Sequence, residues 1–293
     1  MIHKFKFYYK YLLQFFLTIV GIGVITASTY TMFLPRGERL SEFWNQLQIF
    51  FWSFFFFKNL EVNLKDVIYL PFYSTFAEPY FYSLSILFCA FILSIIAALA
   101  LAYATFMSPN IIKKMIHAIV VFLQSIPDVV VLLSLQLFFF WFYHKTNIKL
   151  IDPVSGFESK AYLLPIIVLS IVPTIQLFQM IYLSIEEEKI KDYVEYARAK
   201  GLSNSWILLR HIVRNVSITL LSNSQLIFWL MISNLLIIEY LFNMNGYFSF
   251  LYKNIHAPEI FFMSLVLLFI PFFVIDLVLK TVLNRLKGEN DLV

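Results

Sequence analysis

Six long apolar runs constrain this chain more than any other feature of its sequence. Of the 293 residues, 60% are hydrophobic and 14% are charged, against roughly 25% charged in a soluble domain. About 20 helical residues cross the apolar core of a bilayer, and backbone groups in lipid must be hydrogen-bonded within their own segment. The sequence therefore predicts an all-α, polytopic membrane protein with six transmembrane helices. The runs are Tyr11–Leu34, Tyr80–Met107, Met115–Tyr143, Ala161–Ile185, Val216–Asn243 and Ile260–Leu283.

The first apolar run has a second interpretation, as a cleaved signal peptide. Lys4, Lys6 and Lys10 precede it, and Ala27-Ser28 is a possible cleavage site. The run is about 24 residues long, however, whereas the apolar region of a signal peptide has about 7–15. A transmembrane helix over 11–34 is the favoured interpretation.

Lys and Arg in the connecting segments predict the orientation, because cytoplasmic loops carry an excess of these residues. With both termini inside, fourteen of the 22 Lys and Arg residues are cytoplasmic and eight are external. This arrangement places segments 1–10, 186–215 and 288–293 in the cytoplasm. The segment 35–79 is then external.

The external segment carries an amphipathic pattern. Seven of its apolar residues recur at helical spacing: Phe43, Trp44, Leu47, Phe50, Phe51, Phe54 and Phe55. A stretch of about fifteen residues is too short to cross the bilayer, so an interfacial helix over 43–57 is predicted. It would lie in the outer leaflet or cover the helix bundle, with contact to a binding protein as the alternative.

Two prolines fall inside apolar runs. Pro127 lies in the third run and Pro173 in the fourth. Proline lacks an amide N–H, and its ring clashes with the preceding turn. Each of these two spans is therefore predicted to be kinked, as in a bundle that opens and closes.

Polar side chains within the fifth run are candidates for a substrate pathway. Asn223 and Asn234 lie beside four residues that would share one face of the helix, namely Ser222, Gln225, Trp229 and Ser233. Such groups either hold helices together or line a water-filled cavity. Both alternatives remain open at this point.

Three carboxylates lie within or at the ends of the apolar runs, where an ionisable group is a functional candidate. Asp276 has Lys280 four residues on, a spacing that predicts a structural ion pair. Glu239 is expected to be hydrated, near the outer end of its run. Asp128 directly follows Pro127 and is the carboxylate that we expect to contact substrate.

The cytoplasmic segment between Asp192 and Asn215 is polar and basic, with four cations: Arg198, Lys200, Arg210 and Arg214. Gly201 is predicted to end a helix in the left-handed conformation, and Ser203 is predicted to cap the next helix. Ala197 and Ala199 are small, which would let another protein approach closely. A basic loop at the lipid surface is the alternative, although it does not explain the helix–turn–helix pattern.

The string Glu195-Tyr196-Ala197-Arg198-Ala199-Lys200-Gly201 resembles the "EAA" loop of ABC importer permeases. The wider string from Asp192 to Asn215 is similar to the peptide/nickel subfamily. Arg214 stands where many permeases have proline, although the first of the two peptide permease subunits often has arginine there. Two further segments resemble that subfamily, Ser125-Ile126-Pro127 and Ile238–Phe242 followed by Asn245-Gly246. The likeness covers roughly Tyr80 to Lys287. It implies a permease core over 80–287 with a coupling helix between the fourth and fifth spans.

The resemblance also implies an activity and partners. The loop would sit in a groove of a cytoplasmic ATPase and transmit nucleotide-driven closure to the spans. The residues in contact would be Glu195, Ala197, Arg198, Ala199, Lys200, Gly201, Leu202, Ser203 and Arg210. The implied partners are a second permease subunit, two ATPase subunits, an extracytoplasmic binding protein and membrane lipid, with no nucleic acid. Peptides, nickel or another metal chelate, and opines are the candidate substrates of this bacterial cytoplasmic-membrane protein.

No catalytic residue, metal site or cofactor is expected in this chain. None of the seven glycines begins the phosphate-binding pattern G-x-x-x-x-G-K-[ST], so ATP and Mg²⁺ are expected on the partner ATPase. H-E-x-x-H and G-x-S-x-G are absent, and Cys89 is the only cysteine, which argues against an enzyme. A stand-alone secondary transporter is the alternative function, although its ionisable residues would cluster at the bilayer midplane.

Overall fold

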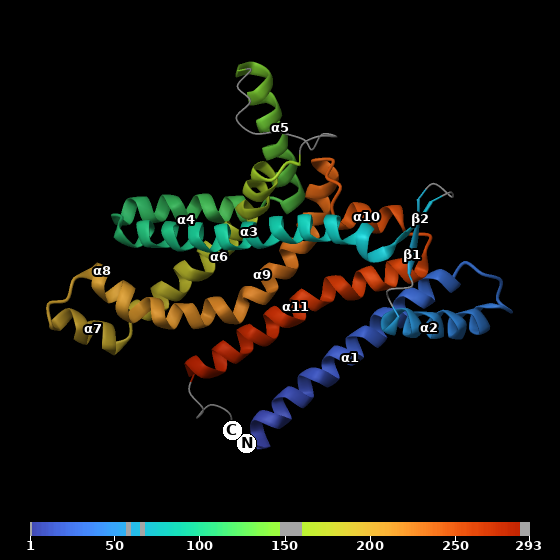
Figure 1. The fold of residues 1–293 in the computed structure, drawn as a ribbon. Coiled ribbons are helices and arrows are strands. Elements are labelled where there is room, and N and C mark those ends of the chain that lie inside the picture. The colour runs from blue at the N-terminus through green and yellow to red at the C-terminus, as the bar shows by residue number, and fades with distance from the viewer. Residues whose placement is uncertain (1, 57–59, 65–67, 147–159, 288–293) are drawn as a thin grey trace. The chain divides into compact units, whose positions relative to one another are not determined.

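The computed structural model describes residues 2–56, 60–64, 68–146 and 160–287, and these residues are almost entirely helical (Figure 1). They form two compact units. One unit comprises residues 1–81 and 246–281, and the other comprises residues 82–245 and 282–293. The division falls within two long helices, α3 (Phe72–Met107) and α11 (Pro258–Lys287).

The first unit contains, besides parts of α3 and α11, the elements α1 (Ile2–Thr31), α2 (Arg39–Phe55), β1 (Glu61–Leu64), β2 (Ile68–Pro71) and α10 (Tyr247–Lys253). The second unit contains α4 (Asn110–Gln124), α5 (Asp128–Thr146), α6 (Leu163–Lys189), α7 (Asp192–Ala199), α8 (Asn204–Ile207), the π-helix η2 (Leu208–Ile212) and α9 (Val213–Leu241). In that unit α6 packs along α9, and α5 contacts both.

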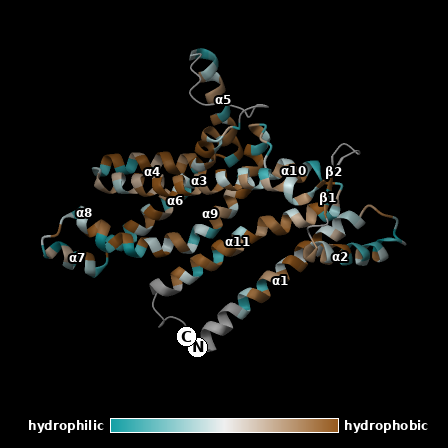
Figure 2. Cartoon of the chain, in the orientation of Figure 1, coloured by the Kyte–Doolittle hydropathy of each residue, from teal (hydrophilic) through white to brown (hydrophobic). Residues whose placement is uncertain are grey.

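Six helical stretches among the described residues are long and apolar enough to cross a membrane, which agrees with the predicted number. They are Tyr9–Thr31, Phe72–Met107, Asp128–Thr146, Leu163–Lys189, Asn204–Leu241 and Pro258–Leu283. Apolar residues dominate these helices, whereas polar residues gather at α7 and α8 (Figure 2). The fourth and sixth lie close to their predicted bounds, and the second begins at Phe72 rather than Tyr80.

The third predicted span, Met115–Tyr143, is wrong in its extent. The helix ends at Gln124, and a new helix begins at Asp128. Pro127 has no N–H to continue α4, and its carbonyl instead accepts the first hydrogen bonds of α5, from Val130 and Val131 at 2.9 and 3.3 Å. The expected kink is thus a complete break, while Pro173 lies inside the continuous helix α6.

A short antiparallel hairpin, β1–β2, was not predicted. Glu61 pairs with Pro71 and Val62 with Leu70. Val62 is buried in a cluster with Phe72, and with Leu60, Phe76, Tyr247, Phe250, Leu251, Ile260 and Met263. A strand of four residues is too short to show a periodic pattern in the sequence. Many of the side chains that bury Val62 belong to α10 and α11, almost 200 residues further along the chain.

Helix α2 confirms the predicted amphipathic helix, at Arg39–Phe55 rather than 43–57. Its inner face packs on α1 and α11, where the Phe50 ring stacks on Phe262 with centroids 4.7 Å apart. Trp44, Phe51 and Trp52 are exposed on its other side. The helix therefore covers part of its own unit, and its position in the outer leaflet stays a prediction.

The Asp276–Lys280 pair confirms the structural role predicted for that carboxylate. Lys280 Nζ lies 2.7 Å from Asp276 Oδ2 and 5.3 Å from the centroid of the Tyr11 ring. The pair thus joins α11 to α1 as well as neutralising a carboxylate within a span.

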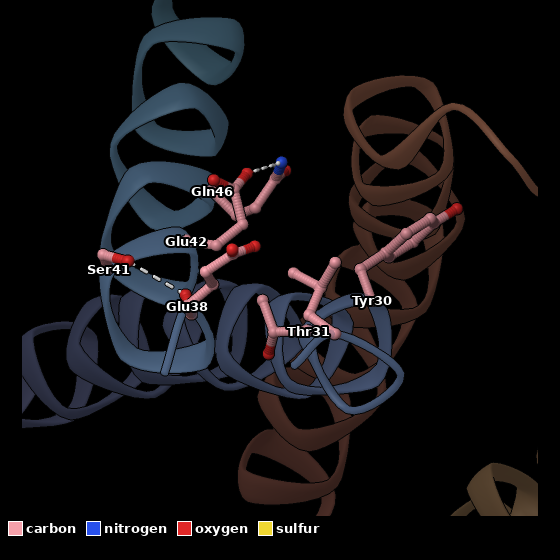
Figure 3. A pocket seen from close by; sticks show the side chains of 7 residues that line it. Tyr30, Thr31, Glu38, Ser41, Glu42 and Gln46 are labelled. Carbon is pink, nitrogen blue, oxygen red and sulfur yellow. Dashed lines mark hydrogen bonds between the residues drawn. The ribbon is translucent and has the colours of Figure 1, made fainter. Parts of the chain in front are cut away.

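A pocket of about 370 Å³ lies at the corner between α1 and α2 (Figure 3). Its lining residues are Tyr30, Thr31, Leu34, Glu38, Ser41, Glu42 and Gln46. Gln46 Nε2 donates to Glu42 Oε1 at 2.9 Å, and Ser41 Oγ donates to the Glu38 carbonyl at 2.9 Å. Local hydrogen bonds of α2 thus order this pocket, which contains none of the residues predicted to contact substrate.

We expect Phe50→Ala to destabilise the first unit by about 3–5 kcal/mol, because it removes a buried ring from the packed face of α2. Phe51→Ala, on the neighbouring residue, is the matched control, since Phe50 is 1% exposed and Phe51 is 66% exposed. The measurement is the Tm of the purified protein in detergent micelles. Equal Tm losses for the two variants would contradict the assigned packing face.

Candidate functional site

The segment Asp192–Ile212 folds as a helix, a tight turn and a second helix, as predicted. Gly201 has φ +77°, a left-handed conformation that glycine adopts without steric cost. The Leu202 N–H donates to the Ala197 carbonyl and the Gly201 N–H donates to the Arg198 carbonyl, at 3.3 and 2.9 Å. This pair of hydrogen bonds is a Schellman motif, which closes the end of α7.

The second helix leads directly into a membrane-spanning helix. Ser203 Oγ accepts from the Trp206 N–H at 3.4 Å, which confirms the predicted N-cap of α8. The helical path then continues through η2 into α9 without a loop, so Asn204–Leu241 is one helical stretch. A displacement of α8 is therefore carried into α9 by a continuous backbone.

The loop segment has a packed face and an exposed face. Val194, Ala197, Ile207 and Leu208 are buried within this chain. The suggestion that Ala197 leaves room for another protein is therefore wrong, because Ala197 is only 4% exposed and faces its own fold. Ala199, by contrast, is exposed as expected.

Three large apolar side chains project from the exposed face: Tyr196, Trp206 and Leu209. Between them lie exposed charged residues, namely Glu195, Arg198, Lys200 and Arg210. Lys200 Nζ lies 4.3 Å from the centroid of the Tyr196 ring, and none of these four charged groups forms an ion pair with another described side chain. The exposed side of the segment thus carries both large apolar side chains and charged groups.

A buried hydrogen-bond cluster behind this face was missed in the sequence. Glu188, at the end of α6, is 9% exposed and accepts hydrogen bonds from Lys191 Nζ, Tyr193 Oη and Asn215 Nδ2. The last of these is 3.0 Å long, and Asn215 Nδ2 also donates to Tyr193 Oη at 3.3 Å. Burial, together with the hydrogen bond to the Glu188 carboxylate and its charge, raises the pKa of Tyr193 to about 12. No spacing pattern marks these residues, because they lie on three different elements.

A second set of contacts braces the base of the loop against the end of α3. Lys189 Nζ lies 4.8 Å from the centroid of the Phe106 ring, and Lys113 Nζ lies 5.6 Å from it. Ser205 Oγ lies 3.6 Å from Met107 Sδ. The loop therefore contacts α3 as well as α6 and α9.

The polar face predicted on α9 exists and is exposed. Ser222, Gln225, Trp229 and Ser233 all lie on the surface of this chain, while the opposite face of α9 packs on α6. The exposure of these side chains leaves both alternatives, packing between helices and a water-filled pathway, as predictions. Asn234 lies on the buried side, and its Nδ2 has no hydrogen-bond partner among the described residues.

The carboxylates of Glu239 and Asp128 differ in burial and in their hydrogen-bond partners. Glu239 is not hydrated as expected, because it is 2% exposed and accepts a 2.5 Å hydrogen bond from Ser83 Oγ, which joins α9 to α3. Asp128 is half-buried in the first turn of α5 and forms no ion pair with another described side chain. No hydrogen bond joins Asp128 to the polar face of α9 in the described part of the chain.

Comparison with known proteins adds the family. Residues 90–288 match the family described as "Binding-protein-dependent transport system inner membrane component". A dipeptide transport system permease protein of Haemophilus influenzae is 33% identical over 127 residues, which are 41% of this chain and 38% of that protein. A glutathione transport system permease protein of Escherichia coli (strain K12) is 30% identical over 95 residues, 32% of this chain and 31% of that protein. The chain spans less than half the length of these relatives.

The fold is similar to a chain of the methionine ABC transporter MetNI in an inward-facing conformation. The TM-score is 0.58 at 15% identity, with 74% of this chain and 98% of that chain covered. The match at this identity concerns the fold alone. The family match, by contrast, includes the whole segment Asp192–Ile212 and the polar face of α9. This multi-pass membrane protein belongs to the family of binding-protein-dependent transport system inner membrane components.

Proposed function

We propose that this chain is the permease subunit of an ATP-driven ABC importer and that Glu195–Leu209 is its coupling helix segment. The observation that carries the proposal is the exposure of Tyr196, Trp206 and Leu209, together with that of the charged residues Glu195, Arg198, Lys200 and Arg210. An apolar centre within a polar rim is the usual composition of a protein interface. The same segment continues into α9, so a partner that moves it also moves a span.

The partner at this face is, in our proposal, a cytoplasmic ATPase that binds ATP and Mg²⁺. The excess of Lys and Arg supports a cytoplasmic position for the segment 186–215 and for both termini. The sequence does not contain a phosphate-binding loop pattern, which agrees with the proposal that ATP binds to another subunit. The protein would thus reside in the cytoplasmic membrane of a bacterium.

The exposed polar face of α9 supports a second permease subunit and a pathway between the two. Polar side chains are costly when they face lipid, and they usually face a bundle interior or a water-filled cavity. Ser222, Gln225 and Ser233 are exposed in the part of the chain that the structure describes. We infer that a second, homologous subunit lies opposite this face and that the substrate passes between the subunits.

Short peptides are the substrate class we favour, delivered by an extracytoplasmic binding protein. The relatives are named for dipeptide and glutathione transport, and both of these substrates contain peptide bonds. Nickel or another metal chelate and opines remain alternatives. A stand-alone secondary transporter fits less well, because Glu239 and Asp276 already have partners within the fold.

We expect Gly201→Val to abolish copurification of the ATPase while the permease still inserts in the membrane. A β-branched residue at φ +77° is strained by roughly 1–2 kcal/mol or more, which opens the turn between α7 and α8. Gly201→Asn is the control, because asparagine tolerates this conformation and no atom lies within 4 Å of the added Cβ. Retention of the ATPase by Gly201→Val would show that the turn is not part of the docking surface.

We also expect cysteines on the exposed face of α9 to react with a water-soluble, membrane-impermeant maleimide in isolated membranes. The variants are Ser222→Cys, Gln225→Cys and Ser233→Cys, each in a Cys89→Ser background. Ser224→Cys is the control, since Ser224 is buried on the same helix. Thiols react as thiolates, which require water, so a lipid-facing position stays unlabelled. If the cysteines at positions 222, 225 and 233 are labelled no faster than the cysteine at position 224, a hydrated pathway along α9 is excluded.

A further inference from the structure

The cluster around Glu188 joins both ends of the loop to one carboxylate. Glu188 belongs to α6, which precedes the loop, whereas Asn215 lies in the first turn of α9, which follows it. Tyr193 lies in α7, within the loop itself. Direct hydrogen bonds connect these three residues pairwise. Three elements that are separate along the chain therefore meet at one buried carboxylate, with Tyr193 and Asn215 half-buried around it.

The chemistry of the cluster makes it a stiff connection. An ionised carboxylate accepts hydrogen bonds only, and here the donors are an ammonium, a phenol and an amide. Hydrogen bonds to a charged group are stronger than neutral ones, and a buried carboxylate that loses its donors is costly. Tyr193, like any tyrosine, is protonated and hence a donor at neutral pH, and its pKa of about 12 extends this to alkaline pH.

Neighbouring acidic residues do not share this arrangement. Glu187 is exposed, and Glu186 forms a local pair with Lys189 on its own helix. Glu188 alone among these three consecutive residues is buried and contacts α7 and α9. The position of Glu188, rather than the acidic character of residues 186–188, is thus what connects the loop to α6 and α9.

We infer that Glu188, with Tyr193 and Asn215, is a positioning cluster that makes the loop move as one body with α6 and α9. This inference rests on the proposed coupling function of the loop. A push on Tyr196, Trp206 or Leu209 then displaces both helices together. Without the cluster, α7 would swing on the Gly201 turn and the push would be lost before it reached α6.

The test uses the full transporter complex in lipid nanodiscs, with variants that remove single groups. Glu188→Gln removes the charge and keeps the shape, while Tyr193→Phe removes only the hydroxyl. The matched control is Glu187→Gln. A swap variant, Glu188→Gln with Asn215→Asp, exchanges the amide and the carboxylate, so that residue 188 donates and residue 215 accepts. Asn215→Asp alone instead places two carboxylates side by side.

Two readouts separate positioning from mere folding. Hydrogen exchange of the α7 amides measures how often the loop detaches. The fluorescence of a probe on Tyr240→Cys, in a Cys89→Ser background, measures whether ATP and vanadate change the far end of α9; Tyr240 is exposed there. We expect about tenfold faster exchange in Glu188→Gln and Tyr193→Phe, as for the loss of one hydrogen bond to a charged group. We further expect a loss of the ATP-dependent signal, with the ATPase still bound.

The swap variant should show slow hydrogen exchange of the α7 amides and the ATP-dependent fluorescence change, as the unmodified protein does. Asn215→Asp alone should show neither. An unchanged signal in Glu188→Gln and Tyr193→Phe would overturn the inference, even if exchange became faster. Failure of the swap to restore the signal would also count against it. If the ATPase still copurifies with Gly201→Val, the proposed docking function is wrong. That result differs from an unchanged probe signal in Glu188→Gln and Tyr193→Phe, which contradicts the positioning cluster alone.

Discussion

Every peptide group inside a bilayer must find its hydrogen-bond partner within the protein, and this constraint governs the whole chain. It makes each long apolar run helical and confines turns to the ends of the runs. The break at Pro127 follows the same rule, because the Phe122 and Leu123 carbonyls at the end of α4 accept from the Ser125 and Ile126 N–H groups, and the Pro127 carbonyl accepts the first hydrogen bonds of α5. The hairpin β1–β2 pairs its own backbone groups and is buried against aromatic side chains of its unit.

The same constraint gives the loop segment its importance. Since α9 is helical from its first residue and continuous with η2 and α8, the loop has no flexible hinge on that side. On the other side Gly201 supplies a turn, and the Schellman hydrogen bonds together with the Glu188 cluster hold α7 in place. The exposed anchors Tyr196 and Trp206 are therefore presented from a rigid base. The proposed transmission of force from an ATPase subunit to the spans would require such rigidity.

Local signals in the sequence predicted local structure well. The left-handed Gly201, the N-cap Ser203 and the Asp276–Lys280 pair follow from neighbours within a few residues, and all three are confirmed. Features that depend on distant neighbours were missed or misread. Glu239 was expected in water and is instead buried against Ser83, because its burial is decided by α3, more than 150 residues earlier.

The sequence by itself determined the membrane class, the number of spans and the family, because apolar length and short motifs are properties of contiguous residues. Tertiary structure alone decided which side of each helix is covered. It turned Ala197 inward, left Ser222 and Gln225 on an open polar face, and gathered Glu188 and Asn215 into one cluster. The physical reason is that burial and hydrogen bonding between elements depend on how helices pack, which no periodicity along one helix specifies.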